Sequence, residues 1–246
     1  MGRLVDIWRH PIKAHGRERL EACDITADQC LPYDREWAVP HEAAKLTPGW
    51  SACQNFSRGA KAPGLMAITC ALDEGRETIT LSHPEKSDIT LDPNGDAAAF
   101  VDWVKPLVPA DRAQPVGLVR RERHGMTDTD FASISLLNLS SHRAVSQAIG
   151  RELSPKRWRG NLWVEGLGPW EEFEWIGKSL TIGTATFKVE ERITRCRATM
   201  ASTRTGRVDA DTLGVLDTQW GHRDFGIYLR CTAPGRIAKG DTAALT

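Results

Sequence analysis

The chain of 246 residues has no apolar run of the length of a membrane-spanning helix, which needs about 20 apolar residues. Its N-terminus, MGRLVDIWRHPIKAHG, also lacks the apolar stretch of a signal peptide. The 32 basic and 32 acidic side chains cancel formally, whereas binding to nucleic acid or to anionic lipid depends on a cationic surface. We therefore expect a cytoplasmic protein that binds neither nucleic acid nor a membrane.

The six cysteines form no Cys-x-x-Cys pair and lie far apart, so neither a disulfide scaffold nor a zinc ribbon is indicated. The seven histidines likewise lack the His-Glu-x-x-His spacing of a zinc protease. Since free cysteine is commonly buried, we expect most of these thiols to be buried and reduced. The cysteines are Cys23, Cys30, Cys53, Cys70, Cys196 and Cys231.

The first hundred residues have the composition of short strands separated by turns. Apolar and polar residues alternate most clearly over 78–81, and the preceding DEGR is a good hairpin connection. Short strands with turns are expected within 4–13, 37–42, 65–84 and 87–96. This half is predicted to be a small β-barrel.

A helix is predicted from Asp96 to Lys105, with Asp96 as its N-cap and Pro106 as its stop. The segment PLVPADRAQPVG that follows is rich in proline and small residues, as linkers are. We therefore expect two units, 1–107 and 108–246.

The second half begins with a strand that runs into a helix, for which Ser140 or Ser141 is the predicted N-cap. Strand-like segments with glycine punctuation follow, and one more helix is indicated over 209–220. The predicted fold class is mainly β (α+β), with two β-barrel units and a few short helices.

A thiol in a basic setting is the most distinctive local feature. In ERITRCRATMASTRTG, Cys196 lies between Arg195 and Arg197, just after a strand-like run. Cationic neighbours favour the thiolate, which is the form that acts as nucleophile or metal ligand. The local sequence alone fits a buried structural thiol with solvent-facing arginines at least as well.

Several motifs together resemble the MOSC family, the domain named after the C-terminal part of molybdenum cofactor sulfurases. The segment TRCRATMASTRTG resembles its cysteine signature, RGNLWVEG its Arg-x-Asn strand, and DFGIYLRCTAPGRIAKGD its closing strand and turn, in the family's order. In the first half, WRHPIKAHGRERLEACDI and LPYDREWAVPHE resemble the β-barrel domain that precedes MOSC in the mitochondrial amidoxime reducing component and its bacterial relatives. The resemblance covers nearly the whole chain.

This resemblance implies that the Cys196 thiolate binds the molybdenum of a molybdopterin cofactor (Moco), as both metal ligand and catalytic residue. A soft thiolate suits molybdenum that is already bound to dithiolene sulfur. Cofactor contacts are implied at Lys13, Arg35, Ser133, Arg159, Asn161 and Arg195. Taken singly, the cations among them also fit strand ends or a solvated face.

Two departures from the family pattern affect the site. Ala14 stands where the family usually has serine, and Ser202 and Thr203 stand where Asp-Pro is frequent. One cofactor contact is then missing and the loop at the substrate entrance differs. His10 and His15 flank Lys13, and a surface or capping role is expected for them rather than an acid role.

The resemblance implies a molybdenum-dependent oxidoreductase that reduces small N-hydroxylated or N-oxygenated compounds. Two alternatives remain open: sulfur transfer through a persulfide on Cys196, and a carrier of the cofactor. Because no cysteine follows Cys231, we expect no appended iron–sulfur domain. Electrons are then expected from a separate donor, such as a ferredoxin, a flavoprotein reductase or a cytochrome.

Overall fold

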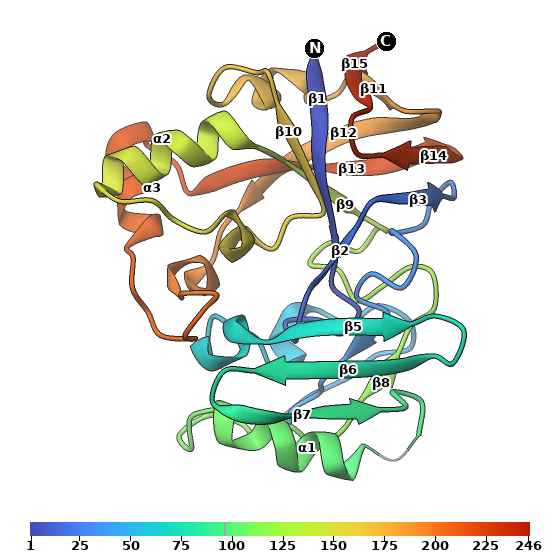
Figure 1. The fold of residues 1–246 in the computed structure, drawn as a ribbon, viewed down its shortest axis with the longest axis vertical. Coiled ribbons are helices and arrows are strands. Elements are labelled where there is room, and N and C mark those ends of the chain that lie inside the picture. The colour runs from blue at the N-terminus through green and yellow to red at the C-terminus, as the bar shows by residue number, and fades with distance from the viewer. Residues whose placement is uncertain (96) are drawn as a thin grey trace.

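The principal element of the computed structural model, which describes residues 1–95 and 97–246, is a closed β-barrel (Figure 1). Within the described residues its strands follow the order β10 (Leu162–Glu165), β9 (Ile134–Asn138), β13 (Asp224–Ala233), β12 (Ala185–Thr194), β11 (Ser179–Ile182), β15 (Thr242–Leu245) and β1 (Gly2–Arg9). Strand β1 pairs back onto β10, which closes the barrel. Neighbouring strands are antiparallel except β9 and β10, which are parallel. The first strand of the chain thus completes a barrel built otherwise from the second half.

The barrel interior follows from the period-2 alternation of its strands. In β12 the side chains of Ala185, Phe187 and Val189 are fully buried, whereas Lys188 between them is exposed. Each fully buried aliphatic or aromatic side chain contributes about 1.5–3 kcal/mol. The other strands supply Leu4, Ile7, Leu136, Leu162, Val164, Leu180, Ile182, Ile227 and Leu229 to the same core.

The first half forms a smaller sheet beside the barrel. Strands β5 (Thr69–Asp73), β6 (Thr78–His83) and β7 (Lys86–Leu91) form an antiparallel meander, with helix α1 (Ala98–Val104) beneath it in Figure 1. The expected DEGR hairpin is confirmed as the β5–β6 turn. The helix is confirmed as well, although its expected cap, Asp96, lies outside the described residues.

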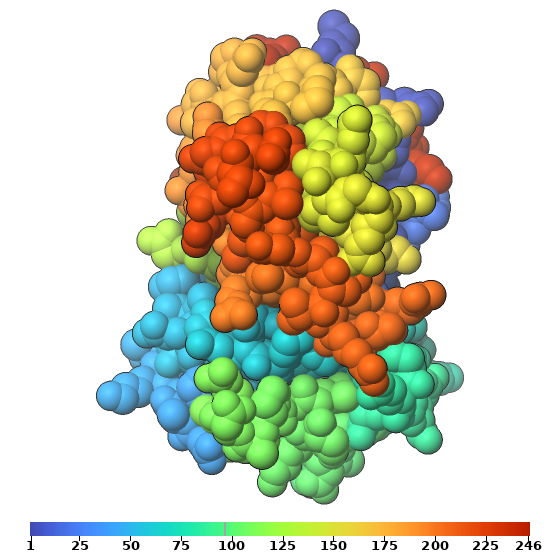
Figure 2. All heavy atoms as spheres, turned by 90° about the vertical axis from the view of Figure 1, so that its left-hand side faces the viewer, coloured from blue at the N-terminus to red at the C-terminus, as the bar shows by residue number. Residues whose placement is uncertain are grey.

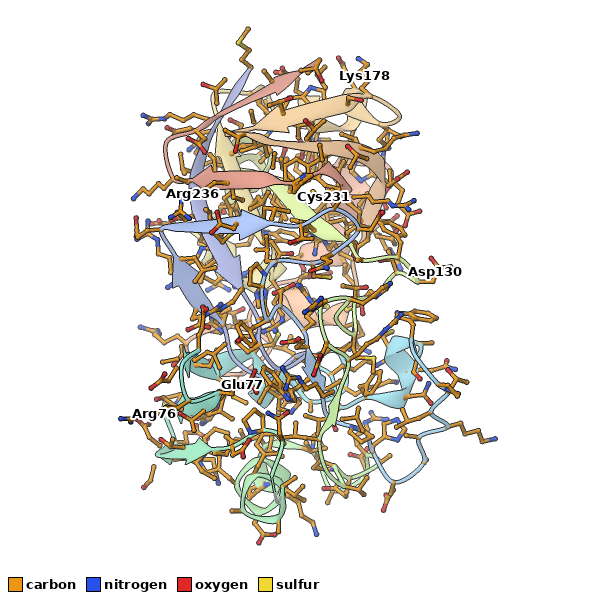
Figure 3. All side chains as sticks on the ribbon, turned by 90° about the vertical axis from the view of Figure 1, so that its right-hand side faces the viewer. Arg76, Glu77, Asp130, Lys178, Cys231 and Arg236 are labelled. Carbon is orange, nitrogen blue, oxygen red and sulfur yellow. The ribbon has the colours of Figure 1, made fainter. Side chains whose placement is uncertain are left out.

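The two halves exchange strands. Besides β1, two strand pairs join the first half to the second: β3 (Ala22–Ile25) with β14 (Gly235–Ala238), and β4 (Trp37–Ala38) with β8 (Val119–Arg120). Strand β2 (Glu18–Leu20) pairs antiparallel with β1. Arg120 also donates to the Glu77 carboxylate of the β5–β6 turn at 3.1 Å; Figure 3 labels Glu77. The unit boundary at 107/108 stays a prediction, because strands of each half pair with strands of the other.

Two helices lie on one side of the barrel (Figure 1), namely α2 (Leu139–Ile149) and α3 (Thr212–Trp220). The prediction that Ser140 or Ser141 caps α2 is wrong. Asn138 is the cap, since its Oδ1 accepts from the Ser140 amide at 2.9 Å, while the Ser141 hydroxyl donates to buried Glu172. No described helix has the length and apolar character needed to cross a bilayer.

Six short 3₁₀ helices are among the described elements. They are η1 (Cys53–Asn55), η2 (Pro63–Ala67), η3 (Lys105–Leu107), η4 (Pro155–Trp158), η5 (Glu171–Trp175) and η6 (Arg197–Met200). The expectation of a strand from residue 65 is therefore wrong for 65–67, where Pro63 starts a helical turn. The overall prediction of a mainly β fold with a few short helices is confirmed.

Candidate functional site

A cavity of about 260 Å³ lies between the barrel and the smaller half, and Cys196 is part of its wall. The first half contributes Lys13, Arg35 and residues within 53–66, and the second half contributes residues within 128–228. In Figure 2 the orange segment that carries Cys196 lies directly against the cyan segment around residues 55–65. The two halves therefore build this wall jointly.

Cys196 is an exposed free thiol at the start of η6, two residues after β12 ends. Its carbonyl accepts hydrogen bonds from the amide and hydroxyl of Thr199 at 3.2 and 3.1 Å. Thr199 is itself held by Thr212 of α3 through a hydroxyl pair at 2.7 Å. The strand end and a fixed turn thus present the thiol, and the expectation that this position leaves the strand for a loop is confirmed.

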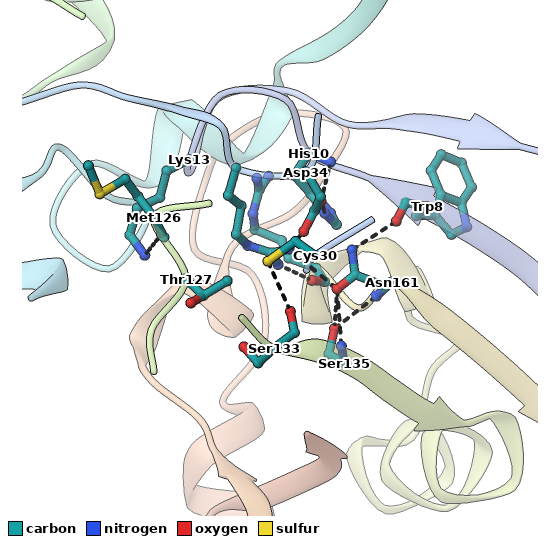
Figure 4. Close-up of polar contacts among 12 residues, drawn as sticks. Trp8, His10, Lys13, Cys30, Asp34, Met126, Thr127, Ser133, Ser135 and Asn161 are labelled. Carbon is teal, nitrogen blue, oxygen red and sulfur yellow. Dashed lines mark hydrogen bonds and ion pairs between the residues drawn. The ribbon is translucent and has the colours of Figure 1, made fainter. Parts of the chain in front are cut away.

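Lys13 is buried, and both hydrogen bonds of its ammonium group go to the segment 126–128. Its Nζ donates to the Met126 carbonyl at 2.7 Å (Figure 4) and to Asp128 Oδ1 at 2.5 Å. The lysine lines the cavity together with Asp128. Its position is therefore fixed before any ligand enters.

Arg35 also lines the cavity and is held on several sides. Its guanidinium forms a close ion pair with Asp34 and donates to Asn161 Oδ1 at 3.3 Å and to the Arg159 carbonyl at 3.0 Å. The charge of Arg35 is thus compensated inside the protein.

Asn161 does not line the cavity, although the resemblance implies a cofactor contact there. Its Oδ1 accepts from the Ser135 hydroxyl at 2.8 Å, and its Nδ2 donates to the Trp8 carbonyl at 3.0 Å (Figure 4). Because Oδ1 also accepts from Arg35, Asn161 orients cavity side chains rather than facing the cavity itself.

Arg159 is the cation of this wall with the most unsatisfied donors. It follows η4 with a φ of 51°, and its Nη1 and Nη2 are shielded from solvent without a hydrogen-bond partner in the described part of the chain. Burial, followed by the like charges of Arg35 and Arg17, lowers the pKa of Arg159 from 12.5 to about 9. Unpaired buried guanidinium nitrogens are costly, so these two nitrogens are suited to donate hydrogen bonds to an anion.

Arg195 lines the cavity with its donors occupied. It donates to the Trp158 carbonyl and, through Nε, to the Phe225 carbonyl, both at 2.8 Å. Burial lowers its pKa to about 10. Arg195 therefore ties η4 to β13 and adds positive charge next to Cys196.

Ser133 is not brought to the cavity. Its hydroxyl accepts from Thr129 at 2.8 Å and its carbonyl lies 3.6 Å from the Cys30 sulfur (Figure 4). Ser135, two residues later, lines the cavity. Ser133 directly precedes β9 and Ser135 is the second residue of that strand; residues two apart share a face, so sequence spacing alone did not select between them.

Sequence reasoning missed five lining residues with ionisable side chains: Cys53, Arg58, Asp128, Arg157 and Tyr228. For Tyr228 a signal existed, since it alternates with buried Ile227 and Leu229 in β13 and so faces the other way. Burial and the nearby Asp128 carboxylate raise the pKa of Tyr228. The others lie in loops or short turns, where no periodicity marks a face.

The histidines beside Lys13 are buried, so the expectation of surface roles is wrong. Burial lowers the pKa of His10 to about 3 and that of His15 to about 4, with Arg159 adding to both shifts. The Nδ1 of His15 donates to the Lys13 carbonyl at 2.7 Å. Both rings are neutral at pH 7 and shape the turn that carries Lys13.

The expectation that most cysteines are buried holds for three of the six. Cys23, Cys30 and Cys231 are buried, Cys53 and Cys70 are partly exposed, and Cys196 is exposed. Figure 3 places Cys231 in the barrel half. Among the described residues, no group of three or more His, Cys, Asp or Glu side chains could hold a metal ion.

Comparison with known families matches residues 121–244 to the MOSC domain and residues 1–109 to the MOSC N-terminal beta barrel domain. The molybdenum cofactor sulfurases of Anopheles gambiae, Drosophila willistoni and Bombyx mori are 38%, 32% and 31% identical to the chain. These alignments cover 92%, 92% and 98% of this chain and 34%, 31% and 33% of those proteins. The chain thus spans about a third of the length of these relatives.

Among solved structures, the YUAD protein of Bacillus subtilis matches 98% of this chain and 92% of its own, with 12% identity and a TM-score of 0.49. YiiM from Geobacillus stearothermophilus matches 46% of this chain and 53% of its own, with 19% identity and a TM-score of 0.35.

Proposed function

The chain belongs to the MOSC domain family, as its motifs indicated, and on this basis we propose that its cavity binds molybdenum cofactor and serves the reduction of small N-oxygenated compounds. One observation carries the proposal. An exposed thiol, Cys196, borders a cavity in which Arg159 has two shielded Nη atoms without a partner among the described residues. A soft metal ligand and a pair of guanidinium donors in one cavity fit a metal cofactor that bears a phosphate.

The residues present fit this cofactor. Cys196 offers a thiolate to molybdenum, and Arg159 offers a planar pair of donors to phosphate. Lys13, Arg35 and Arg195 add positive charge to the same wall, and only Asp128 among the lining side chains opposes it. The first and second halves each supply part of this set.

The bound cofactor would supply the two-electron removal of oxygen from the substrate. The chain would bind and orient both, and it offers a hydrogen-bond donor at the same cavity. Because the pKa of Tyr228 is raised, its phenol stays protonated at neutral pH and can donate a hydrogen bond to an oxygen in the cavity. We further propose that electrons come from a separate ferredoxin, flavoprotein reductase or cytochrome.

Sulfur transfer is the second candidate, and the names of the curated relatives favour it. An exposed thiol in a cationic setting is suited to carry a persulfide. Under this alternative Cys196 would hold a transferable sulfur in place of the metal.

The test is the molybdenum content and pterin fluorescence of wild type and Cys196→Ala, both produced in a host that makes the cofactor. We expect near-stoichiometric metal and pterin in wild type and loss of the metal in the variant. Reduction of an N-hydroxylated compound with a chemical electron donor then tests the activity. A wild-type protein with a persulfide on Cys196 and neither metal nor pterin would contradict the reductase proposal and support sulfur transfer.

A further inference from the structure

The cations of the cavity divide into those that the protein compensates and those that it does not. Lys13, Arg35 and Arg157 form ion pairs with Asp128, Asp34 and Asp209, respectively. Arg195 is saturated by backbone carbonyls. The two remaining lining guanidinium groups, Arg58 and Arg159, have neither a carboxylate within 4.0 Å nor a full set of carbonyl acceptors in the part of the chain that the structure describes.

These two uncompensated groups lie at different depths. The Nη atoms of Arg159 are shielded from solvent and would donate hydrogen bonds to the cofactor of the proposed function. Arg58 is partly exposed, and the one hydrogen bond that its side chain makes to the described residues is from Nη1 to the sulfur of Cys53, at 3.1 Å. Cys53 is partly exposed as well, so this pair belongs to the solvent side of the cavity.

The segment of Arg58 packs on the turn that carries Cys196. A Cβ on Gly59 would lie 3.3 Å from Ala198 Cβ and 2.7 Å from the Met66 sulfur, so only glycine permits this approach. Ala198 is two residues from Cys196, and all four residues line one cavity. Arg58 is therefore held next to the reactive end of the cavity, with donors free for a ligand.

We infer that Arg58 and Cys53 form a second subsite at the mouth of this cavity, which binds the carboxylate of a small anionic substrate. A guanidinium matches a carboxylate with two parallel hydrogen bonds, and its remaining Nη and Nε donors are available for this. The substrate class, an N-oxygenated compound bearing a carboxylate, rests on the proposed function; the anion subsite itself does not.

Cys53 serves as the reporter for the subsite, because it is next to Arg58 and is not the proposed metal ligand. The experiment measures the alkylation rates of Cys53 by iodoacetate and by iodoacetamide, using peptide mass spectrometry on the whole protein. The thiolate fraction affects both reagents equally and cancels in their ratio. The ratio therefore reports attraction of the anionic reagent alone.

In Arg58→Gln we expect the iodoacetate-to-iodoacetamide ratio to fall about fivefold, as expected for one unit charge at contact distance in water. Arg58→Lys should keep the wild-type ratio. Lys61→Gln is the matched control, since Lys61 is exposed, nearby and not part of the cavity wall, and its ratio should stay unchanged. An equal ratio in wild type and Arg58→Gln would overturn the inference.

A wild-type measurement keeps the test independent of how the variants fold. The ratio at Cys53 should exceed the ratio of a small free thiol such as N-acetylcysteine amide. A ratio no higher than that of the free thiol, or a Cys53 that resists both reagents, would overturn the subsite.

The substrate assignment is tested on the cofactor-loaded protein with an aryl amidoxime and its para-carboxylate. Arg58→Gln should lower the preference in kcat/KM for the carboxylate about fivefold, with a molybdenum content equal to that of wild type. An unchanged preference, or loss of molybdenum, would overturn the assignment, the latter because the anion at Arg58 would then belong to the cofactor. If wild type reduces neither compound, the proposed function fails, and the alkylation ratio still decides the subsite.

Discussion

Arg35 donates a hydrogen bond from Nη2 to the carbonyl oxygen of Arg159 across 3.0 Å, so two arginines share one wall of the cavity. Only one of them is neutralised. Arg35 has Asp34 as its partner, whereas both Nη atoms of Arg159 lack one in the described structure. This asymmetry leaves the Arg159 guanidinium as the group of this wall best suited to bind an anion.

Arg159→Gln should stabilise the protein without cofactor and lower its cofactor content. Removing an unpaired, shielded charge relieves a desolvation cost, so we expect a gain of about 1–3 kcal/mol in the free energy of unfolding. Urea denaturation of cofactor-free protein and pterin fluorescence of loaded protein measure the two effects.

Arg157→Gln is the matched control for this change. Arg157 is buried nearby but donates to the Thr199 carbonyl at 2.9 Å and pairs with Asp209 at 3.1 Å, so its loss should destabilise the fold. If both variants destabilised the cofactor-free protein to the same extent, Arg159 would not be an uncompensated charge, and its role in binding an anion would be refuted.

Stability should fall as the pH drops from about 6.5 to about 4, in part because of His15. Its pKa is lowered from 6.5 to about 4 in the folded protein, so the unfolded chain binds more protons in this window. One such group changes the unfolding free energy by up to about 1.4 kcal/mol per pH unit. Urea denaturation of wild type and His15→Gln at several pH values measures this, and the variant should show the smaller slope. Identical slopes would rule out a depressed His15 pKa.

Gly59→Ala should destabilise the protein, because its Cβ would lie 2.7 Å from the Met66 sulfur and 3.3 Å from Ala198 Cβ. Overpacking of this kind costs about 1–3 kcal/mol. Gly117→Ala is the control, since a Cβ there would meet nothing within 4 Å. Thermal unfolding of both variants tests the contact; equal melting temperatures would show that segment 58–60 does not pack on the Cys196 turn.

Ser135→Ala should lower cofactor retention more than Ser133→Ala. Ser135 bonds twice to Asn161, at 2.8 and 2.9 Å through its hydroxyl, and Asn161 also orients Arg35. Loss of these bonds at a buried site should cost about 1–3 kcal/mol. Ser133 accepts a hydrogen bond from the Thr129 hydroxyl, and that hydroxyl can donate to the Phe131 carbonyl instead. Loss of the Ser133 hydroxyl should therefore matter less. Pterin content after gel filtration compares them, and greater loss in Ser133→Ala would show that the resemblance placed the contact correctly.

Local patterns predicted the local elements well. The DEGR turn, the helix of Phe100 and Val104, and the helix ending at Trp220 form where alternation and capping residues indicate them. The failures come from contacts between distant segments. Asn138 rather than a serine caps α2, and the Ser141 hydroxyl donates instead to Glu172, a residue 31 positions away.

By itself, the sequence determined the family and the mainly β class, and it marked Cys196 as a distinctive thiol just after a strand, because ordered motifs and strand periodicity are properties of the chain itself. The exposure of that thiol was decided by the tertiary structure. The tertiary structure alone decided which cations are free. Whether an arginine is neutralised depends on carboxylates and carbonyls brought from distant segments, as Asp209 is to Arg157 and Phe225 is to Arg195. Within the described residues, Arg58 and Arg159 have no such partner, because the packing of the closed barrel against the smaller sheet brings no carboxylate to them. Electrostatic compensation acts through space rather than along the chain.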